Sequence, residues 1–267
     1  MASKKVNRYS ALIEHVFVAA YKAGSKQVTF DREELETAAA ELEIKLPKNL
    51  GDIVYSFKYR NALPEAIRKT SPSGREWVIV NRGRGKYAFE LRSQVQILPD
   101  PLLITTKIPD ATPGVVERYA LGDEQALLAR LRYNRLLDIF TGVACYSLQN
   151  HLRTTVKGIG QVETDELYVG VDKHGAHYVF PVQAKGGNDR LAVVQIEQDF
   201  AMCREKFPEL VCRSVAAQFM EENVIALFEF ALDENGEVKK VSERHYHLVP
   251  QSELTDEEIA QYRERAS

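Results

Sequence analysis

The spacing of apolar residues predicts three helices within the first 60 positions. The first covers residues 9–21, and the second begins at Asp31, where Glu34 completes a capping-box pattern three residues later. The third follows Pro47 and turns an apolar side inward. Its predicted buried side is Leu50, Ile53, Val54 and Phe57, and its predicted outer side is Asn49, Asp52, Ser56, Lys58 and Arg60.

After residue 74 the pattern becomes that of β-strands. Residues 77–80 and 87–91 are rich in β-branched and aromatic side chains, and the glycine-rich segment 81–86 forms the tip between them. Three helices followed by a hairpin with a basic tip resemble a winged helix-turn-helix domain. In that family the third helix enters the major groove and the hairpin contacts phosphate. The same pattern also occurs in protein–protein modules. As a DNA-binding domain over residues 1–95, it is expected to use Asn49, Lys58, Arg60, Arg82, Arg84 and Lys86.

The rest of the chain alternates between helical and strand-like patterns. Residues 96–121 contain four prolines, which predict a linker or irregular arm. The order of the elements after it predicts an α/β (α+β) fold with a mixed sheet flanked by helices. Helices are predicted over 123–140, over a second piece that runs to about 153, over 191–206 and over 255–265. Strands are predicted over 161–171, 177–185, 209–219, 224–232 and 237–249.

Composition narrows the class of protein. The chain has 267 residues, of which 45% are hydrophobic and 27% charged, and this ordinary balance excludes an intrinsically disordered chain. No stretch has the roughly 18–20 uncharged apolar residues of a membrane helix. Three cysteines without a CxxC pair argue against a disulfide framework or a zinc site. The first residues lack the apolar core of a signal peptide, so a cytoplasmic location is expected.

The net charge of −3 hides an uneven distribution. Residues 1–95 carry a net charge of +6, and residues 96–267 carry −9. The basic excess lies between Leu46 and Arg92. Clustered basic charge is typical of a module that binds a polyanion, although a solvated surface explains it equally well.

Candidate chemistry lies in the hairpin predicted over 161–185. Side chains two apart on a strand share a face, so Glu163 and Asp165 point the same way, as do Gln183 and Lys185. When the turn at 172–175 closes the hairpin, the start of its first strand lies beside the end of its second. Two carboxylates, an amide and an ammonium group then converge. Carboxylate oxygens are ligands that Mg²⁺ prefers, and a lysine stabilises charge on a phosphate under attack.

This segment resembles the signature of the PD-(D/E)XK nuclease superfamily, an aspartate followed by (Glu/Asp)-x-Lys at the end of the next strand. Asp165 matches the family aspartate and Lys185 the lysine, whereas Gln183 stands where the family usually has an acid. The resemblance covers about residues 123–232 and implies a nuclease domain over 122–267. It implies catalytic roles for Asp165, Gln183 and Lys185, and Glu163 is expected to supplement Asp165 because Gln183 carries no charge.

The resemblance also implies a metal. Mg²⁺, for which Mn²⁺ substitutes, would be held by Asp165, Glu163 and Gln183. Family members often add an acidic or amide residue from the preceding helix. Gln195 and Gln198, on the helix after the hairpin, are predicted to face solvent, although in some nucleases of this superfamily a glutamine here helps to position the active site. The candidates on the preceding helices are Asn134, Asp138 and Gln149.

The leading hypothesis is an Mg²⁺-dependent endonuclease that cuts double-stranded DNA at a specific site, as type II restriction endonucleases do. A homodimer is the simplest way to cut both strands of a symmetric site, and a cognate methyltransferase would act separately. The uncharged Gln183 favours one alternative, a non-catalytic winged-helix DNA-binding regulator with a degenerate nuclease fold. The other is a structure-specific repair or recombination nuclease.

Overall fold

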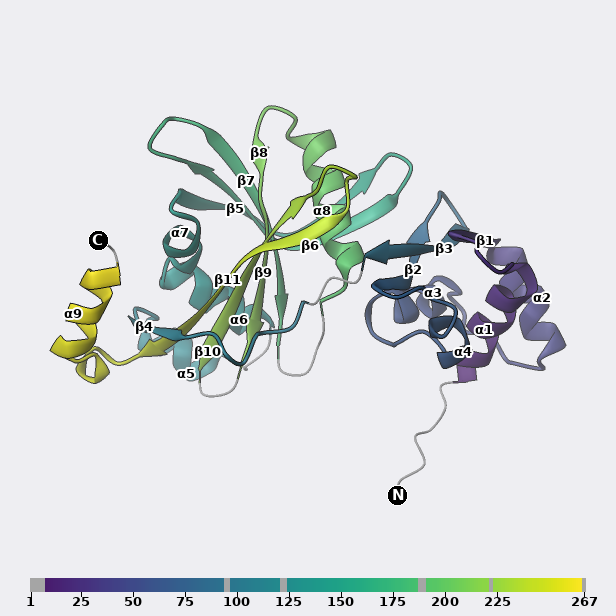
Figure 1. The fold of residues 1–267 in the computed structure, drawn as a ribbon, viewed down its shortest axis with the longest axis horizontal. Coiled ribbons are helices and arrows are strands. Elements are labelled where there is room, and N and C mark those ends of the chain that lie inside the picture. Colours follow the sequence, from purple (N-terminus) through teal and green to yellow (C-terminus); the bar gives the residue numbers. More distant parts are fainter. Residues whose placement is uncertain (1–7, 94–96, 121–123, 187–190, 221–222, 266–267) are drawn as a thin grey trace, which may run out of the picture.

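The computed structural model describes residues 8–93, 97–120, 124–186, 191–220 and 223–265, and it is a mixed α/β structure with two sheets (Figure 1). We call residues 8–93 the N-terminal module. This module combines a three-stranded sheet, in the order β1-β3-β2, with helices α1 to α4. Its elements are α1 (Arg8–Ala20), β1 (Gln27–Asp31), α2 (Arg32–Glu41), α3 (Gly51–Tyr59), α4 (Glu65–Arg68), β2 (Arg75–Asn81) and β3 (Lys86–Ser93).

The predicted elements of this module are present. Asp31 and Glu34 form the expected capping box at the start of α2, with hydrogen bonds of 3.0 and 2.8 Å. The apolar side of α3 is buried as predicted, in one core with α1 and the sheet. Strand β1 was not predicted, because only Val28 and Phe30 alternate inward in a segment of five residues.

The second sheet has eight strands and is mixed, as expected from the sequence. Its order is β4-β11-β10-β9-β7-β6-β5, with β8 beside β7. The hairpin that carries the candidate chemistry is confirmed, since β6 and β7 pair antiparallel from Val171↔His177 to Glu166↔Val182. The strands are β4 (Thr105–Pro109), β5 (Ala144–Val156), β6 (Gly160–Val171), β7 (His177–Lys185), β8 (Val211–Cys212), β9 (Ser214–Phe219), β10 (Val224–Leu232) and β11 (Val238–Val249).

The helix predicted over 123–140 is divided into Glu124–Tyr133 and Leu136–Thr141, and the strand predicted over 209–219 is divided into β8 and β9. Two other predicted segments have a different secondary structure. The second helical piece expected to run to about residue 153 is instead β5, which begins directly after Gly142, the left-handed residue (φ 68) that ends the preceding helix. As an edge strand, β5 is exposed throughout 146–151 and therefore shows no apolar alternation. The expected linker over 96–121 contains β4, which pairs in parallel with β11, and a short helix, α5 (Gly114–Tyr119).

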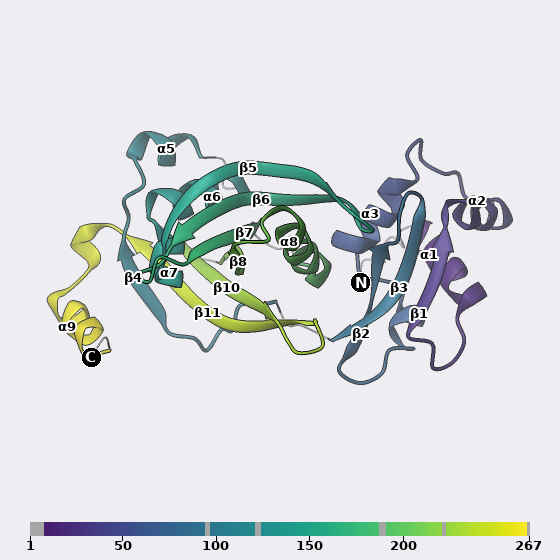
Figure 2. The ribbon, with the colours of Figure 1, turned by 90° about the horizontal axis from the view of Figure 1, so that it is seen from above.

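Helices cover both faces of the large sheet (Figure 2). Helices α6 (Glu124–Tyr133) and α7 (Leu136–Thr141) pack their leucines on one face, against β7, β9 and β10. Helix α8 (Val193–Lys206) packs on the other face, where Ile196, Phe200 and Cys203 are buried. The exposed helix α9 (Asp256–Arg265) lies at the end opposite the N-terminal module. Within the described ranges, no helix is long and apolar enough to cross a membrane.

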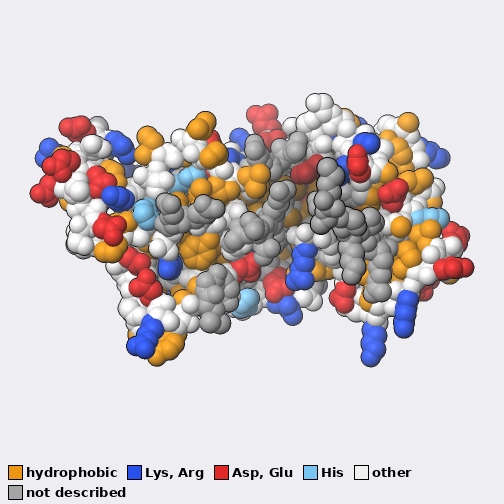
Figure 3. Space-filling view, turned by 90° about the horizontal axis from the view of Figure 1, so that it is seen from below, with side chains coloured by type: hydrophobic (Ala, Val, Ile, Leu, Met, Phe, Trp, Pro, Cys, Tyr) orange, Lys and Arg blue, Asp and Glu red, His pale blue; other side chains and the backbone are white. Residues whose placement is uncertain are grey.

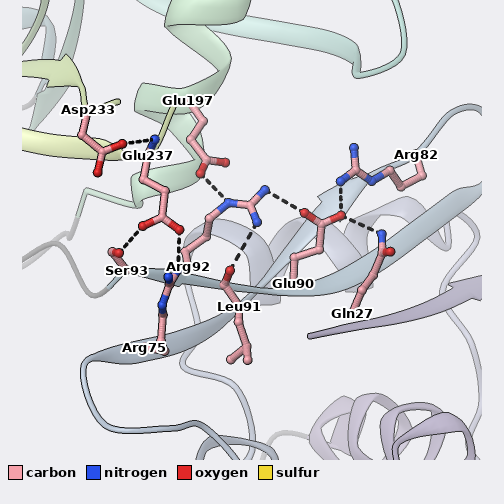
Figure 4. A network of polar contacts seen from close by, with 10 residues as sticks. All are labelled: Gln27, Arg75, Arg82, Glu90, Leu91, Arg92, Ser93, Glu197, Asp233 and Glu237. Carbon is pink, nitrogen blue, oxygen red and sulfur yellow. Dashed lines mark hydrogen bonds and ion pairs between the residues drawn. The ribbon is translucent and has the colours of Figure 1, made fainter. Parts of the chain in front are cut away.

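The N-terminal module packs directly on α8 and the second sheet. Val80 and Ala88 of its hairpin share a buried cluster with Phe200 and Phe228. Polar contacts surround this cluster (Figure 4): Arg92 contacts Glu197 of α8 at 2.5 Å, and Glu237 binds both Arg75 and Ser93. Apolar burial and ion pairs together hold α3 near the ends of β6 and β7.

Candidate functional site

A cavity of about 1420 Å³ lies between α3 and the ends of β6 and β7. The four residues predicted to be catalytic all line it, and so do two basic residues that were predicted to bind DNA. The structure therefore joins two residue sets that are more than 100 positions apart in the sequence. These six residues are Glu163, Asp165, Gln183, Lys185, Lys58 and Arg60.

Asp165 and Lys185 form the centre of this site. The backbone N–H of Ala184 donates to Asp165 Oδ2 at 2.8 Å, which ties the carboxylate of β6 to the end of β7. Lys185 Nζ lies 2.8 Å from Glu124 Oε1 on α6. Burial raises the pKa of Asp165, the Ala184 N–H and Lys185 oppose that rise, and the Glu124 carboxylate adds to it. Two carboxylates and one ammonium group thus interact at one edge of the cavity.

Gln183 belongs to a buried polar network. Its Nε2 donates to both carboxylate oxygens of Asp199 at 3.1 Å and to the Glu163 carbonyl at 3.2 Å. Its Oε1 accepts from Gln195 Nε2 at 3.2 Å, and Thr164 Oγ1 donates to Asp199 at 2.6 Å. These bonds hold the amide in one orientation. Its oxygen is bonded to Gln195, a residue of α8 that lines the cavity.

The raised pKa of Asp199 predicts that the free energy of unfolding depends on pH in a specific way. Burial raises its pKa to about 7, although Thr164 and Gln183 stabilise its charged form, whereas an unfolded aspartate titrates near 4. The folded state therefore keeps the proton over this interval, and its stability falls as pH rises from about 4 to about 7. Asp199→Asn removes this titration. Urea unfolding should show the wild type losing stability relative to the variant by up to about 1.4 kcal/mol per pH unit in that window.

Above about pH 7 the difference between wild type and Asp199→Asn should become constant, because both the folded and the unfolded aspartate are then ionised. A difference in unfolding free energy that does not change with pH would contradict the raised pKa of Asp199.

The predicted metal ligands are only partly in place. Glu163 lines the cavity, but its side chain is directed to Arg153 on β5, with Oε1 and Oε2 3.0 and 3.1 Å from Nη2. The two predicted carboxylates therefore do not act as a pair. Among the described residues, no group of three or more His, Cys, Asp or Glu side chains is arranged to hold a metal ion.

The donor set nevertheless fits a hard cation that keeps part of its water shell. Asp165 and Glu124 supply carboxylate oxygens, Gln183 supplies an amide oxygen, and all three line the cavity. Mg²⁺ is commonly bound by one or two carboxylates with water and substrate phosphate rather than by a complete protein cage. The absence of sulfur and the scarcity of imidazole make this set unsuitable for structural zinc.

Sequence reasoning missed Glu124. An acidic residue in the first turn of a helix is normally explained by its favourable interaction with the helix dipole. Glu124 therefore did not stand out in the sequence as a site residue. The candidates from this region lie elsewhere: Asn134 binds Ala111 N, Asp138 binds Cys145 N, and Gln149 is exposed on β5. Glu124 reaches the site because α6 packs on β7 with its first residue at the end where β7 stops.

Gln195 and Gln198 are also placed differently from the prediction. Both line the cavity instead of facing solvent, and Gln198 is buried. Gln198 Oε1 accepts a hydrogen bond of 2.9 Å from the Tyr59 hydroxyl of α3. Spacing alone could not show this, because the N-terminal module covers that face of α8 only in the folded structure.

The residues predicted to contact DNA have different surroundings. Lys58 is buried rather than exposed, and burial lowers its pKa to about 8 against the opposing effect of Glu197. Arg82 is ion-paired with Glu90, while Asn49, Arg60, Arg84 and Lys86 are exposed. On the face shown in Figure 3, basic and acidic side chains are interspersed over both parts of the molecule. The basic excess therefore does not form a single uniform patch on that face.

Comparison of the chain with protein-family models, with curated proteins and with solved structures finds no match in any of the three. The function is therefore inferred from the geometry of the cavity and the chemistry of its side chains.

Proposed function

We propose that this protein is an Mg²⁺-dependent DNA endonuclease of the type II restriction kind, and that the cavity is its active site. The observation that carries the proposal is the arrangement of Asp165, Lys185 and Glu124 at the end of β7, with Lys58 and Arg60 across the same cavity. Carboxylates that hold a cation, beside an ammonium group, are suited to phosphodiester hydrolysis.

Each residue has a role that follows from its contacts. Asp165 and Glu124, with the Gln183 oxygen, would hold Mg²⁺, which when bound lowers the pKa of water and neutralises charge on phosphate. The ion pair of 2.8 Å between Lys185 Nζ and Glu124 Oε1 fixes the lysine side chain. Lys185 presents its ammonium group to the scissile phosphate and stabilises the charge that develops there. Asp199 keeps the Gln183 amide from rotating.

The N-terminal module is proposed to be a winged-helix DNA-binding domain, and residues 122–267 a nuclease domain. Helices α1 to α3 and the β2–β3 hairpin of the N-terminal module support the winged-helix assignment, and the exposed Arg84 and Lys86 at the hairpin tip suit phosphate contacts. Cutting both strands of a symmetric site would require two copies of the chain, as in a homodimer.

The direct test is incubation of the purified chain with supercoiled plasmid and Mg²⁺, with a chelator as the control. Linear or nicked product that depends on the metal is the expected result. Sequencing of the fragment ends, together with branched and flap substrates, separates site-specific restriction from structure-specific repair cleavage. Intact plasmid and intact branched DNA with both Mg²⁺ and Mn²⁺ would overturn the proposal.

A non-catalytic DNA-binding regulator is the second candidate, and the surroundings of Gln183 favour it. An amide replaces the usual acid, and both ends of that amide are engaged by Asp199 and Gln195. DNA binding that is independent of metal, without any cleavage, would support this function.

A further inference from the structure

Helix α3 presents alternating rings and cations to the cavity. The rings of Tyr55 and Tyr59 lie 4.8 Å apart, centroid to centroid, at an interplanar angle of 64°. The guanidinium carbon of Arg60 is 5.2 Å from the centroid of Tyr55, and Lys58 Nζ is 4.9 Å from that of Tyr59. All four side chains line the cavity that contains Asp165 and Lys185. We call these four residues the α3 wall.

Two residues of the α3 wall, Lys58 and Tyr59, are held in place, and the other two, Tyr55 and Arg60, are exposed. The Tyr59 hydroxyl donates to buried Gln198 on α8, and Lys58 is only 8% exposed, so these two side chains are fixed. Tyr55 is 46% exposed although it borders the cavity, and Arg60 is exposed beside it. One exposed aromatic side chain is ordinary, but a ring that combines with neighbouring cations inside a cavity has the composition of a binding surface.

In this position the C-terminal end of α3 does not suit reading of a duplex. A helix that enters the major groove, about 12 Å wide, must offer a free outer face to the base edges. Here Lys58 and Tyr59 on that helix face α8 and the candidate catalytic residues. Buried Lys58 is therefore placed to contact a nucleic-acid segment that enters the cavity.

The chemistry of the cavity matches that of a nucleotide whose base is unpaired. Bases stack on aromatic rings regardless of sequence, and nearby Lys or Arg side chains contact the backbone, as in proteins that bind single strands. The volume of about 1420 Å³ exceeds the roughly 300–1,000 Å³ of small-molecule pockets, which leaves room for more than one nucleotide. Amide side chains that could bond base edges line the same space: Asn81, Gln161 and Gln195.

We propose that the α3 wall binds an unpaired nucleotide of a DNA strand, with its base stacked on Tyr55 and its phosphate on Lys58 and Arg60. This inference rests on the proposed nuclease function, because it directs the strand to Asp165 and Lys185 in the same cavity. The unpaired nucleotide comes either from a single strand or from a base extruded from a duplex, which nucleic-acid enzymes also accept.

The test is the binding of labelled DNA to the full chain by fluorescence anisotropy, in chelator so that cleavage plays no part. Three probes are compared: a thymidine oligomer, a blunt duplex, and the same duplex with one unpaired central nucleotide. Tyr55→Ala should weaken binding of the single strand or the bulged duplex by roughly 5- to 160-fold, the range that corresponds to loss of one stacking ring. Tyr55→Phe should restore that binding, since it keeps the ring.

Tyr119 provides the matched control, because it is exposed, has Arg118 5.7 Å from its ring centroid and lies on α5 outside the cavity. Tyr119→Ala should bind like wild type. If binding of the thymidine oligomer depends on Tyr55, the nucleotide comes from a single strand. If binding of the bulged duplex depends on Tyr55, the nucleotide is extruded from a duplex. Equal affinity for all three probes, or equal behaviour of Tyr55→Ala and Tyr119→Ala, overturns the inference even if the plasmid is cut. Tyr55-dependent binding without any cleavage supports nucleotide binding by the α3 wall and overturns the proposed nuclease function.

Discussion

Asp165→Asn is expected to reduce DNA cleavage on the order of 10³-fold or more, with the protein still folded. The substitution keeps the shape of the side chain but removes the negative charge that would hold the proposed cation beside the scissile phosphate. Because burial raises the pKa of Asp165, its ionised form is already disfavoured in the folded state. Loss of that charge should therefore not lower the melting temperature. The measurement is the initial rate of plasmid cleavage under saturating Mg²⁺, together with thermal unfolding.

Asp256→Asn is the control for this prediction, because Asp256 is an exposed aspartate in the first turn of α9. It should cleave at the wild-type rate. Retained cleavage by Asp165→Asn would show that the site lies elsewhere, whereas a large fall in its melting temperature would show that Asp165 is structural.

Local patterns predicted most of the elements around the site. The capping box of α2, the buried side of α3 and the hairpins β6–β7 and β10–β11 follow from spacing and turn residues within short segments. Strand β5 could not be predicted in this way, because an exposed edge strand has no buried face to impose alternation. Strand β4 pairs with β11 about 140 positions later, and no local signal encodes that contact.

The candidate site was predictable where it depends on one hairpin. The proximity of Asp165 to the end of β7 follows from strand pairing alone, and the Ala184 N–H contact bears it out. The contributions of Glu124, Gln198 and Lys58 depend on how α6, α8 and α3 pack on that hairpin. Their roles come from tertiary contacts between distant segments, so single-sequence periodicity carries no information about them.

The buried position of Lys58 changes the expected role of the basic charge in the N-terminal module. A solvent-exposed helix would attract DNA over a broad surface, with strong dependence on salt. Lys58 lies instead inside the cavity, where its pKa of about 8 leaves it mostly protonated at neutral pH. Its positive charge therefore faces the cavity that Asp165 and Lys185 also line, and a phosphate bound there would lie between the ammonium groups of Lys58 and Lys185.

Glu124→Gln is expected to lower cleavage by about 100-fold and to change its pH profile. The substitution leaves an oxygen for Lys185 Nζ but removes one of the two carboxylates near the proposed metal. Because the Glu124 carboxylate raises the pKa of Asp165, its removal lowers that pKa. The acid limb of the cleavage profile should therefore move to lower pH, and more Mg²⁺ should be needed for half-maximal rate. Both are read from cleavage rates over pH and over Mg²⁺ concentration.

The control is Glu117→Gln, on the exposed surface of α5, which should change neither profile. If Glu124 acts with Lys185 as one unit, Lys185→Ala in the Glu124→Gln background should cost less than Lys185→Ala alone, because interacting residues are not additive. A rate loss without any shift in pH or Mg²⁺ dependence would limit Glu124 to positioning Lys185. An unchanged rate would show that the 2.8 Å ion pair stabilises the fold and takes no part in the chemistry.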